Sequence, residues 1–449
     1  MKKILLIGAG RSTSSLVQYL LFNAENENWF ITIADQSKDF ASEAAGDHKL
    51  AKAIAFDVNN EEERTRLIDE HDLIISMLPA HMHISVAKDC IKYKKHMATA
   101  SYVSEEMKAL DSEAKNAGIV MMNEIGVDPG IDHMSAMRVI DEIRNNGGDL
   151  KAFETFTGGL VAPESDNNPW NYKFTWNPRN VVLAGTGTAQ FIQGGKYKYI
   201  PYTKLFRRTE IIDIEGYGKF EGYANRDSLS YREVYNLENI PTMYRGTLRK
   251  PGYCKAWDVF VQLGATDDTY VLEGSENMTN REFINSFLAF NPNDSVELKF
   301  KHYLNIRQDD IELFEKFEWL GIFEDTKIGL KDATPAQILQ HILEQKWTLA
   351  PEDKDMIVMW HRFRFVTANG EDKEIHSSMV VKGDDQRYTA MAKTVGLPLA
   401  ISVKMILNGT IATPGVHVPI LGEIYNPILN ELENYGINFK EKEVTPTFY

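Results

Sequence analysis

Three carboxylates and an imidazole lie within the segment from Asn123 to His133, which reads Asn-Glu-Ile-Gly-Val-Asp-Pro-Gly-Ile-Asp-His. Asp128 can face an ammonium or a secondary amine, and an unperturbed imidazole such as His133 titrates near neutral pH. Asp132 opens a predicted helix, where an aspartate usually caps the first turn. Asp128 and His133 are therefore candidates for acid–base chemistry, with turn formation beside Pro129 as the alternative for Asp128 and a purely structural role as the alternative for His133.

A short apolar run leads directly into a Gly-x-Gly turn at the start of the chain, Ile4-Leu5-Leu6-Ile7-Gly8-Ala9-Gly10-Arg11-Ser12-Thr13. Gly8 permits a tight turn, and Gly10 lets the backbone approach a pyrophosphate that faces the N–H groups of the following helix. The motif alone is weak, because Thr13 stands where the dinucleotide fingerprint has glycine or alanine. We expect a nicotinamide dinucleotide bound by Gly8, Gly10, Arg11, Ser12 and Thr13.

The predicted second strand, residues 29–34, ends in Asp35 at the distance from the glycines that a ribose-binding acid occupies. Its carboxylate can accept hydrogen bonds from both adenosine ribose hydroxyls and would repel a 2′-phosphate. Gln36 supplies no positive charge, although Arg11 or Lys38 could reach a phosphate. The sequence therefore favours NAD as the cofactor and leaves NADP possible.

Polar side chains suited to a multiply charged small molecule occur in two further places. Ser101 and Tyr102 follow a predicted strand, and their hydroxyls could contact a nicotinamide ribose or a substrate carboxylate. For Tyr102 we favour binding over a role as an acid. Arg226 and Arg249 can each hold a carboxylate in bidentate fashion, which a lysine cannot reproduce. The structural alternatives are a surface ion pair of Arg226 with Asp227 and a strand-edge charge at Arg249.

Alternating strands and helices position these groups in the first part of the chain. The predicted strands end at Gly8, Asp35, Asp57, Pro79, Ser101 and Asn123-Glu124. This alternation predicts an α/β fold, a Rossmann doubly wound parallel sheet, whose ligands gather where the strands end. After Asp128, β-type segments separated by long loops predict an α+β substrate domain, and helical periodicity between residues 280 and 345 predicts a helical insertion.

The C-terminal segments are expected to return to both domains. Residues 356–366 lead to Asn369-Gly370, which predicts a hairpin that rejoins the second sheet. Residues 398–407 read as a buried helix with Pro398 in its first turn and Gly409 just past its end. We therefore assign residues 1–127 and 393–449 to the dinucleotide-binding Rossmann domain, 128–279 and 351–392 to the α+β substrate domain, and 280–350 to the helical insertion.

The composition of the 449 residues, 43% hydrophobic and 25% charged, is ordinary for a folded protein. A net charge of −15 without a Lys/Arg cluster argues against nucleic acid as a partner. Two distant cysteines fit a reducing compartment, and His81 and His83 lack a third metal ligand at a recognisable spacing. The apolar run before Gly8 is too short for a signal peptide, and no stretch approaches the roughly 20 apolar residues of a membrane helix. We expect a cytoplasmic protein without a metal.

Several longer motifs occur in one order along the chain. They are the segment Asn123 to His133, Gly158-Gly159-Leu160 with Ala162-Pro163-Glu164, Asn168-Pro169 with Tyr172-Lys173-Phe174, Asn225-Arg226-Asp227-Ser228, and Arg245-Gly246-Thr247-Leu248-Arg249. Together they resemble the glutamate-forming saccharopine dehydrogenase family, also called saccharopine reductase. The resemblance runs from Gly8 to the region of Asn408-Gly409-Thr410-Ile411.

That family couples 2-aminoadipate 6-semialdehyde with glutamate through an imine, which a nicotinamide cofactor reduces to saccharopine, or it runs the reverse oxidation. The resemblance implies substrate contacts at Ser101, Tyr102, Asp128, Arg226, Thr247, Leu248 and Arg249. It implies cofactor contacts at the turn from Gly8 to Thr13 and at Asp35, Asp57, Pro79, Asp128, Pro129 and Gly130.

The chain departs from this family in two places. Fungal members resembling it carry an arginine after the second strand, suited to NADPH, where this chain has Asp35-Gln36. They also tend to have a cysteine where this chain has Thr157, so no thiol role can be carried over.

We read the chain as an NAD(P)-dependent oxidoreductase of lysine metabolism acting on a CH–NH group, with Asp128, Tyr102 and His133 as candidate catalytic groups. Closure of a cleft between two lobes is expected to bring Arg226 and Arg249 toward the nicotinamide. The alternatives are a related imine-reducing dehydrogenase of carboxynorspermidine or opine type, and a catalytically silent nucleotide-binding homologue. The expected partners are the small-molecule substrate and, as one possibility, a second copy in a homodimer, with no membrane.

Overall fold

The computed structural model describes residues 1–447 and divides the chain into two compact units. Unit 1 comprises residues 1–150 and 365–446, and unit 2 comprises residues 151–364 together with Thr447. The predicted boundary at residue 127 therefore lies earlier than the division seen in the structure. Residues 365–392, predicted to belong to the substrate domain, lie in unit 1.

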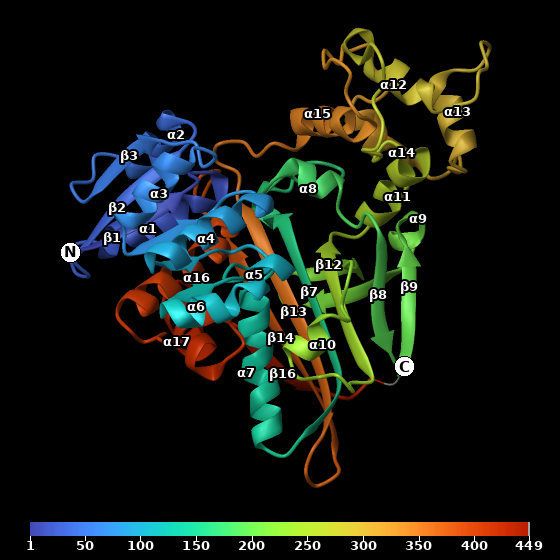
Figure 1. The fold of residues 1–449 in the computed structure, drawn as a ribbon. Helices are drawn as coiled ribbons and strands as arrows, with labels where there is room; N and C mark the ends of the chain where they lie inside the picture. Colours follow the sequence, from blue (N-terminus) through green and yellow to red (C-terminus); the bar gives the residue numbers. More distant parts are fainter. Residues whose placement is uncertain (448–449) are drawn as a thin grey trace. The chain divides into compact units, whose positions relative to one another are not determined.

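Unit 1 contains a seven-stranded parallel sheet in the order β15-β6-β5-β4-β1-β2-β3, which confirms the doubly wound Rossmann prediction. Strands β1, β2 and β3 of this sheet are labelled in Figure 1. The strands are β1 (Lys2–Ile7), β2 (Trp29–Asp35), β3 (Ala51–Ala55), β4 (Leu73–Ser76), β5 (His96–Ala98), β6 (Val120–Met122) and β15 (Gly415–His417). Buried strands such as Leu73–Ser76 are apolar almost throughout, because helices cover a parallel sheet on both faces.

Helices and short 3-10 turns alternate with these strands. They are η1 (Arg11–Thr13), α1 (Ser14–Asn23), α2 (Lys38–Ala45), α3 (Glu61–Asp69), η2 (Ala80–Met82), α4 (His83–Tyr93), α5 (Glu105–Ala109) and α6 (Asp111–Ala117). Leu5, Ile74 and Met97 from the strands form one buried cluster with Val86 and Cys90 from α4. This core fixes the strand ends from which the candidate site residues project.

Helix α7 (Ile131–Asn145) belongs to unit 1 because it packs on α17 (Gly422–Glu433). The Tyr425 hydroxyl on α17 donates a hydrogen bond to Asp141 on α7, at 2.8 Å. In the same unit, β14 (Asp372–Lys382) pairs antiparallel with β16 (Lys440–Val444). These contacts give the physical reason for the later boundary: residues 128–150 and 372–382 find partners in the C-terminal segment.

Helix α16 (Ala390–Leu407) begins eight residues before Pro398, so the prediction of proline in its first turn is wrong. The helix starts at Ala390 because the Thr389 hydroxyl accepts a hydrogen bond from the Ala392 N–H group, at 2.9 Å. By length and its mean hydropathy of 1.5 this helix could cross a membrane, which the sequence reading did not recognise. Since 72% of it is buried inside the protein, it also fits the core helix of a globular unit.

Unit 2 contains a mixed sheet with strands in the order β10-β11-β12-β7-β13, and β8 pairs with both β12 and β9. Its strands are β7 (Asp149–Val161), β8 (Thr188–Gln193), β9 (Lys196–Pro201), β10 (Thr209–Ile214), β11 (Gly218–Ala224), β12 (Thr242–Arg249) and β13 (Asp355–Val366). Strand β12 runs parallel to β7 and antiparallel to β11. This mixture confirms the predicted α+β architecture.

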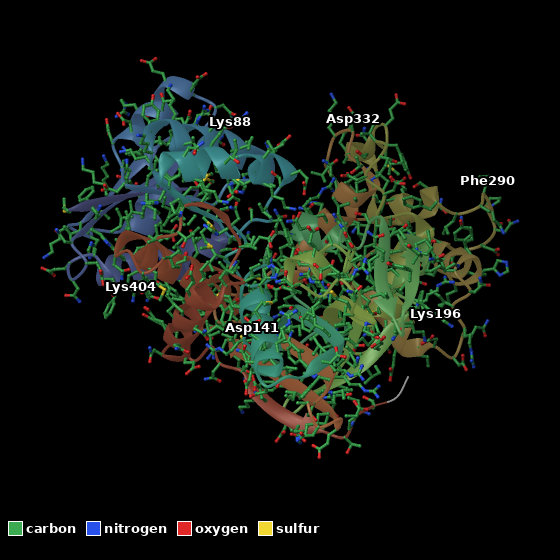
Figure 2. The ribbon with its side chains drawn as sticks, turned by 60° about the horizontal axis from the view of Figure 1, so that its bottom comes forward. Lys88, Asp141, Lys196, Phe290, Asp332 and Lys404 are labelled. Atoms are coloured by element: carbon green, nitrogen blue, oxygen red, sulfur yellow. The ribbon has the colours of Figure 1, made fainter. Side chains whose placement is uncertain are left out.

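The helices of unit 2 include four in the range predicted as an insertion. They are η3 (Pro163–Ser165), α8 (Pro178–Val182), α9 (Tyr202–Leu205), α10 (Tyr231–Val234), α11 (Tyr253–Leu263), η4 (Ser275–Asn277), α12 (Asn280–Ser286), α13 (Val296–Tyr303), α14 (Ile311–Trp319) and α15 (Pro335–Trp347). Trp170 stacks on Phe260 and meets Trp347 edge-on, with ring centroids 5.8 Å and 5.2 Å apart. Beyond α12, Phe290 is 93% exposed and points outward (Figure 2).

The contact between α16 and α1 depends on a glycine. A Cβ atom at Gly396 would lie 2.6 Å from the backbone nitrogen of Leu16. We expect Gly396→Ala to destabilise the protein by about 1–3 kcal/mol, because the clash outweighs the better helix propensity of alanine. Gly422→Ala is the control, since a Cβ there first meets an atom at 3.5 Å. A thermal unfolding midpoint that does not fall for Gly396→Ala would contradict this packing.

Candidate active site

The glycine turn has the geometry expected of a phosphate-binding loop. Gly8 adopts φ +101°, and a Cβ there would lie 2.7 Å from the carbonyl oxygen of Met77. Gly10 has no atom within 4 Å of such a position, so the space beside it is open. Thr13 is buried and its hydroxyl donates to the Gly10 carbonyl at 2.6 Å. Threonine at the third position of the fingerprint therefore holds the turn together.

Asp35 is bound to this turn and is half-buried. One carboxylate oxygen accepts a hydrogen bond from the Ala9 N–H group and the other accepts one from the Ser37 N–H group, both at 2.8 Å. Each carboxylate oxygen can accept a further hydrogen bond, which leaves room for ribose hydroxyls. The aspartate thus fits the predicted ribose role and also fixes the loop.

Beside Asp35, a cavity of about 330 Å³ is lined by Gln36, Ala55, Phe56 and Asp57. Asp57 is exposed, and its Oδ1 accepts hydrogen bonds from the backbone and side-chain nitrogens of Asn59 at 2.9 and 3.0 Å. The cavity lies where β2 and β3 end, as expected for the nucleotide end of a dinucleotide.

Two cations and a proline complete the predicted cofactor contacts along this edge. Arg11 and Lys38 are exposed, and neither forms an ion pair within residues 1–447. Pro79 is exposed after β4 and caps η2, and Ser12 is half-buried in η1. The structure therefore places the predicted cofactor residues of the first four strands at the carboxyl edge of the sheet.

Tyr102 and Asp128 are brought together in unit 1. The Tyr102 side chain is 51% exposed, and its hydroxyl donates to Oδ1 of Asp128 at 3.3 Å. Pro129 follows through a cis peptide bond, and Gly130 closes on Gly126, whose N–H group donates to the Pro129 carbonyl at 2.9 Å. Asp128 is half-buried, so this pair can reach a bound molecule.

Glu124 holds both ends of the segment that carries Tyr102. Its N–H group donates to the Ser101 carbonyl at 3.0 Å, and its Oε1 accepts from the Val103 N–H group at 2.9 Å. Oε2 lies 2.7 Å from Nε2 of His133. Sequence reasoning noted Glu124 only as a strand end, because nothing in the sequence indicates the direction of its side chain.

His133 has no exposed surface. Because a group that exchanges protons with a bound molecule must be accessible to it, the structure does not support the predicted catalytic role of His133. The imidazole is instead placed to hold Glu124. The prediction that Asp132 caps α7 is wrong, because Gly130 occupies the capping position; Asp132 lies in the first turn and accepts a hydrogen bond from the Gly130 N–H group at 2.6 Å.

In unit 2, Arg226 lies exposed in the loop after β11. Its Nη2 is 3.4 Å from both the Leu183 carbonyl and the Thr186 hydroxyl, and it forms no ion pair with any described residue. Asp227 instead accepts from the N–H groups of Leu229 and Ser230. The alternative of a surface ion pair between Arg226 and Asp227 is therefore wrong.

Arg249 at the end of β12 is 3% exposed, so it is not a strand-edge charge. Its guanidinium carbon lies 5.1, 5.8 and 5.3 Å from the ring centroids of Tyr172, Tyr223 and Tyr253. Burial raises the pKa of all three phenols above the ordinary value, so they remain neutral at physiological pH. Arg249 is a buried cation surrounded by uncharged rings.

The guanidinium of Arg249 retains unused hydrogen-bonding capacity. Nη1 donates to the Leu248 carbonyl at 2.8 Å, whereas Nε has no partner, and no carboxylate among residues 1–447 pairs with the group. A buried charge without a counter-ion is costly. A ligand carboxylate would supply the missing charge.

Thr247 and Arg249 share one face of β12, while Leu248 is fully buried on the other. Through its side chain Leu248 cannot contact a ligand that Thr247 and Arg249 hold. Only the backbone of Leu248 could therefore make the predicted contact with the substrate.

No group of three His, Cys, Asp or Glu side chains in the described part of the chain is arranged to hold a metal.

Comparison with known proteins agrees with this geometry. The saccharopine dehydrogenase NADP binding domain model matches residues 4–122, and the saccharopine dehydrogenase C-terminal domain model matches residues 126–437. The saccharopine dehydrogenases [NADP(+), L-glutamate-forming] of Schizosaccharomyces pombe and Saccharomyces cerevisiae are each 34% identical to this chain, with 98–99% of this chain and 99% of theirs covered.

The mitochondrial alpha-aminoadipic semialdehyde synthase of Rattus norvegicus is also 34% identical, and the match covers 98% of this chain but 47% of that protein. The structure of apo saccharopine dehydrogenase (L-Glu forming) from Saccharomyces cerevisiae matches with a TM-score of 0.90 at 32% identity, over 99% of this chain and all of the other. Both domain models and full-length relatives agree, and the chain belongs to the saccharopine dehydrogenase family.

Proposed function

We propose that this chain is a glutamate-forming saccharopine dehydrogenase. It condenses the aldehyde of 2-aminoadipate 6-semialdehyde with the amino group of glutamate, losing water to give an imine, and reduces the C=N bond to the secondary amine of saccharopine. The reverse direction oxidises that amine and adds water. The observation that carries the proposal is the buried Arg249, which has no acidic partner among residues 1–447, in a chain whose full-length relatives bear this name.

The substrate chemistry suits the unit 2 residues. Saccharopine carries three carboxylates, and a planar guanidinium binds a carboxylate through two parallel hydrogen bonds. Arg249 supplies a desolvated site for one carboxylate, with the Thr247 hydroxyl on the same strand face. Arg226 supplies an exposed site for another, since its guanidinium forms only two long hydrogen bonds with residues 1–447.

In unit 1, Asp128 and Tyr102 are the groups proposed to handle protons. Imine formation and hydrolysis require protons to leave the amine and to reach the leaving water. Asp128 is proposed to accept the amine proton, and the Tyr102 hydroxyl, hydrogen-bonded to it, orients the carboxylate and binds substrate. The nicotinamide cofactor supplies the hydride when bound, and Gly8, Gly10 and Asp35 are the residues that would hold it.

The family model and the relatives are named for NADP, whereas the residues at the end of β2 suit NAD. We propose that this chain prefers NAD. Support comes from the Asp35 carboxylate, which the Ala9 and Ser37 N–H groups hold where it would meet the adenosine ribose. A negative charge there repels a 2′-phosphate, and Gln36 offers no compensating cation. The cytoplasmic location of the protein and its possible homodimer stay predictions.

The substrate assignment is tested by coupling 2-aminoadipate semialdehyde with different amines while NADH or NADPH oxidation is followed. We expect glutamate to be used at least tenfold better than a diamine such as diaminopropane, because only glutamate supplies carboxylates for the arginines. A diamine that performs as well as glutamate would favour the carboxynorspermidine-type alternative. Tight cofactor binding without turnover of any pair would favour a catalytically silent homologue.

Replacing Arg249 by methionine should separate binding from stability. The variant removes an unpaired buried cation, so we expect the thermal midpoint to stay the same or rise, while the KM for saccharopine rises at least 100-fold. Arg362→Met is the matched control, because Arg362 is equally buried but pairs with Glu154 at 3.1 Å. Breaking that pair should destabilise the protein by about 3–5 kcal/mol. An unchanged KM in Arg249→Met would remove Arg249 from the substrate site.

The cofactor preference is tested with Asp35→Asn, since asparagine removes the charge and its carbonyl oxygen can still accept one backbone hydrogen bond. We expect the ratio of kcat/KM with NAD to kcat/KM with NADP to fall at least tenfold, about 1.4 kcal/mol. Asp39→Asn on the exposed face of α2 is the control for a general change of charge. An unchanged ratio in Asp35→Asn would show that Asp35 does not bind the adenosine ribose.

A further inference from the structure

A buried imidazole joins two neighbouring strand ends of unit 1. His83 is the first residue of α4 and is 4% exposed. Its Nδ1 lies 2.8 Å from the hydroxyl oxygen of Ser76 at the end of β4, and its Nε2 lies 2.7 Å from the hydroxyl oxygen of Ser101 after β5. The sequence drew attention to His83 only as a possible metal ligand beside His81, because the two serines are brought to it only by the fold.

The ring is neutral, because burial lowers the pKa of His83 to about 4, assisted by the charge of His81. A neutral imidazole has one N–H donor and one acceptor nitrogen. The two serine hydroxyls must therefore play opposite parts: if the ring donates to one, it accepts from the other. The hydrogen-bond direction at Ser76 and the direction at Ser101 are linked through the ring.

The Ser101 backbone is held independently of His83. Its carbonyl accepts from the Glu124 N–H group at 3.0 Å, and its N–H group donates to the Thr99 hydroxyl at 3.2 Å. His83 therefore determines where the Ser101 hydroxyl points and does not hold the chain. Ser101 is half-buried, whereas Ser76 is fully buried, so only the Ser101 end of this linkage can reach a ligand.

We propose that His83 is a positioning residue that makes the Ser101 hydroxyl a hydrogen-bond donor to a substrate carboxylate. The inference rests on the proposed function, because a carboxylate only accepts hydrogen bonds and so requires Ser101 to donate. The Ser101 oxygen then accepts from His83 Nε2–H, and His83 Nδ1 accepts from the Ser76 hydroxyl. A carboxylate ligand at Ser101 therefore requires that His83 carry its ring proton on Nε2.

A double-mutant cycle tests this linkage, with saccharopine oxidation followed at saturating cofactor. His83→Leu and Ser101→Ala should each raise the KM for saccharopine about tenfold with little change in kcat, as for loss of one hydrogen bond to a charged group. The double variant should show the same tenfold rise, because both changes remove one interaction. A rise of about 100-fold in the double variant would mean independent effects and would overturn the proposal.

His83→Gln serves as the conservative variant, since its amide N–H can still donate to Ser101, and it should recover most of the lost affinity. A lower unfolding temperature for His83→Leu with unchanged KM would show a structural role alone, and a rise in the cofactor KM in place of the saccharopine KM would assign Ser101 to the cofactor. Either result overturns the proposal. Turnover of saccharopine by the unaltered protein tests the proposed function separately.

The protonated nitrogen can be read without any substitution. Nitrogen-15 NMR of the histidine-labelled protein with a dicarboxylic substrate analogue such as glutarate bound should show His83 protonated on Nε2 and unprotonated on Nδ1. Protonation on Nδ1 would leave Nε2 to accept the hydroxyl proton of Ser101, so that Ser101 could only accept a hydrogen bond from a ligand, which would rule out the proposed contact. Ser76→Ala, which removes the partner of Nδ1, identifies the His83 signal by its shift.

Discussion

Backbone N–H groups left unpaired where parallel strands end are the constraint on which unit 1 depends. Loops that leave such a sheet cannot satisfy these groups within the ladder, so side chains must do so. Three carboxylates serve this purpose: Asp35 accepts from Ala9 and Ser37, Glu124 from Val103, and Asp132 from Gly130. Each hydrogen bond fixes a loop that also carries a candidate ligand contact. The carboxyl edge of the sheet is therefore shaped before any ligand arrives.

Among the buried charges of unit 2, Arg249 differs from Arg362 and Lys173 in having no partner of opposite charge among residues 1–447. Buried pairs such as Arg362 with Glu154 and Lys173 with Asp353 are satisfied inside the protein, at 3.1 and 2.6 Å. Arg249 is equally buried but has aromatic neighbours in place of a carboxylate. Cation–π contacts recover part of the cost of its desolvation, but they do not neutralise its charge. This contrast within unit 2 is the basis for proposing that the partner of Arg249 is a ligand carboxylate.

Local patterns predicted the parts of the structure that local chemistry determines. The Gly8 turn and the strand ending in Asp35 follow from glycine spacing and alternating elements. The start of α16 was predicted wrongly, because Pro398 also fits a first helical turn, whereas the helix is capped by Thr389 and begins at Ala390. Glu124 and His133 are nine residues apart in a loop and a helix, so their contact depends on a fold that spacing alone does not reveal.

Cofactor choice and loop geometry are joined in one side chain. In Asp35 the same carboxylate that would exclude a 2′-phosphate also accepts from the backbone of the glycine turn. An arginine in place of Asp35 would leave the Ala9 and Ser37 N–H groups without this acceptor, because a guanidinium only donates hydrogen bonds. A change of preference from NAD to NADP therefore requires both a cation that binds the 2′-phosphate and a new acceptor for the Ala9 N–H group. In Asp35→Asn, the loss of one backbone hydrogen bond is expected to weaken both cofactors, while the loss of the charge shifts the preference from NAD toward NADP.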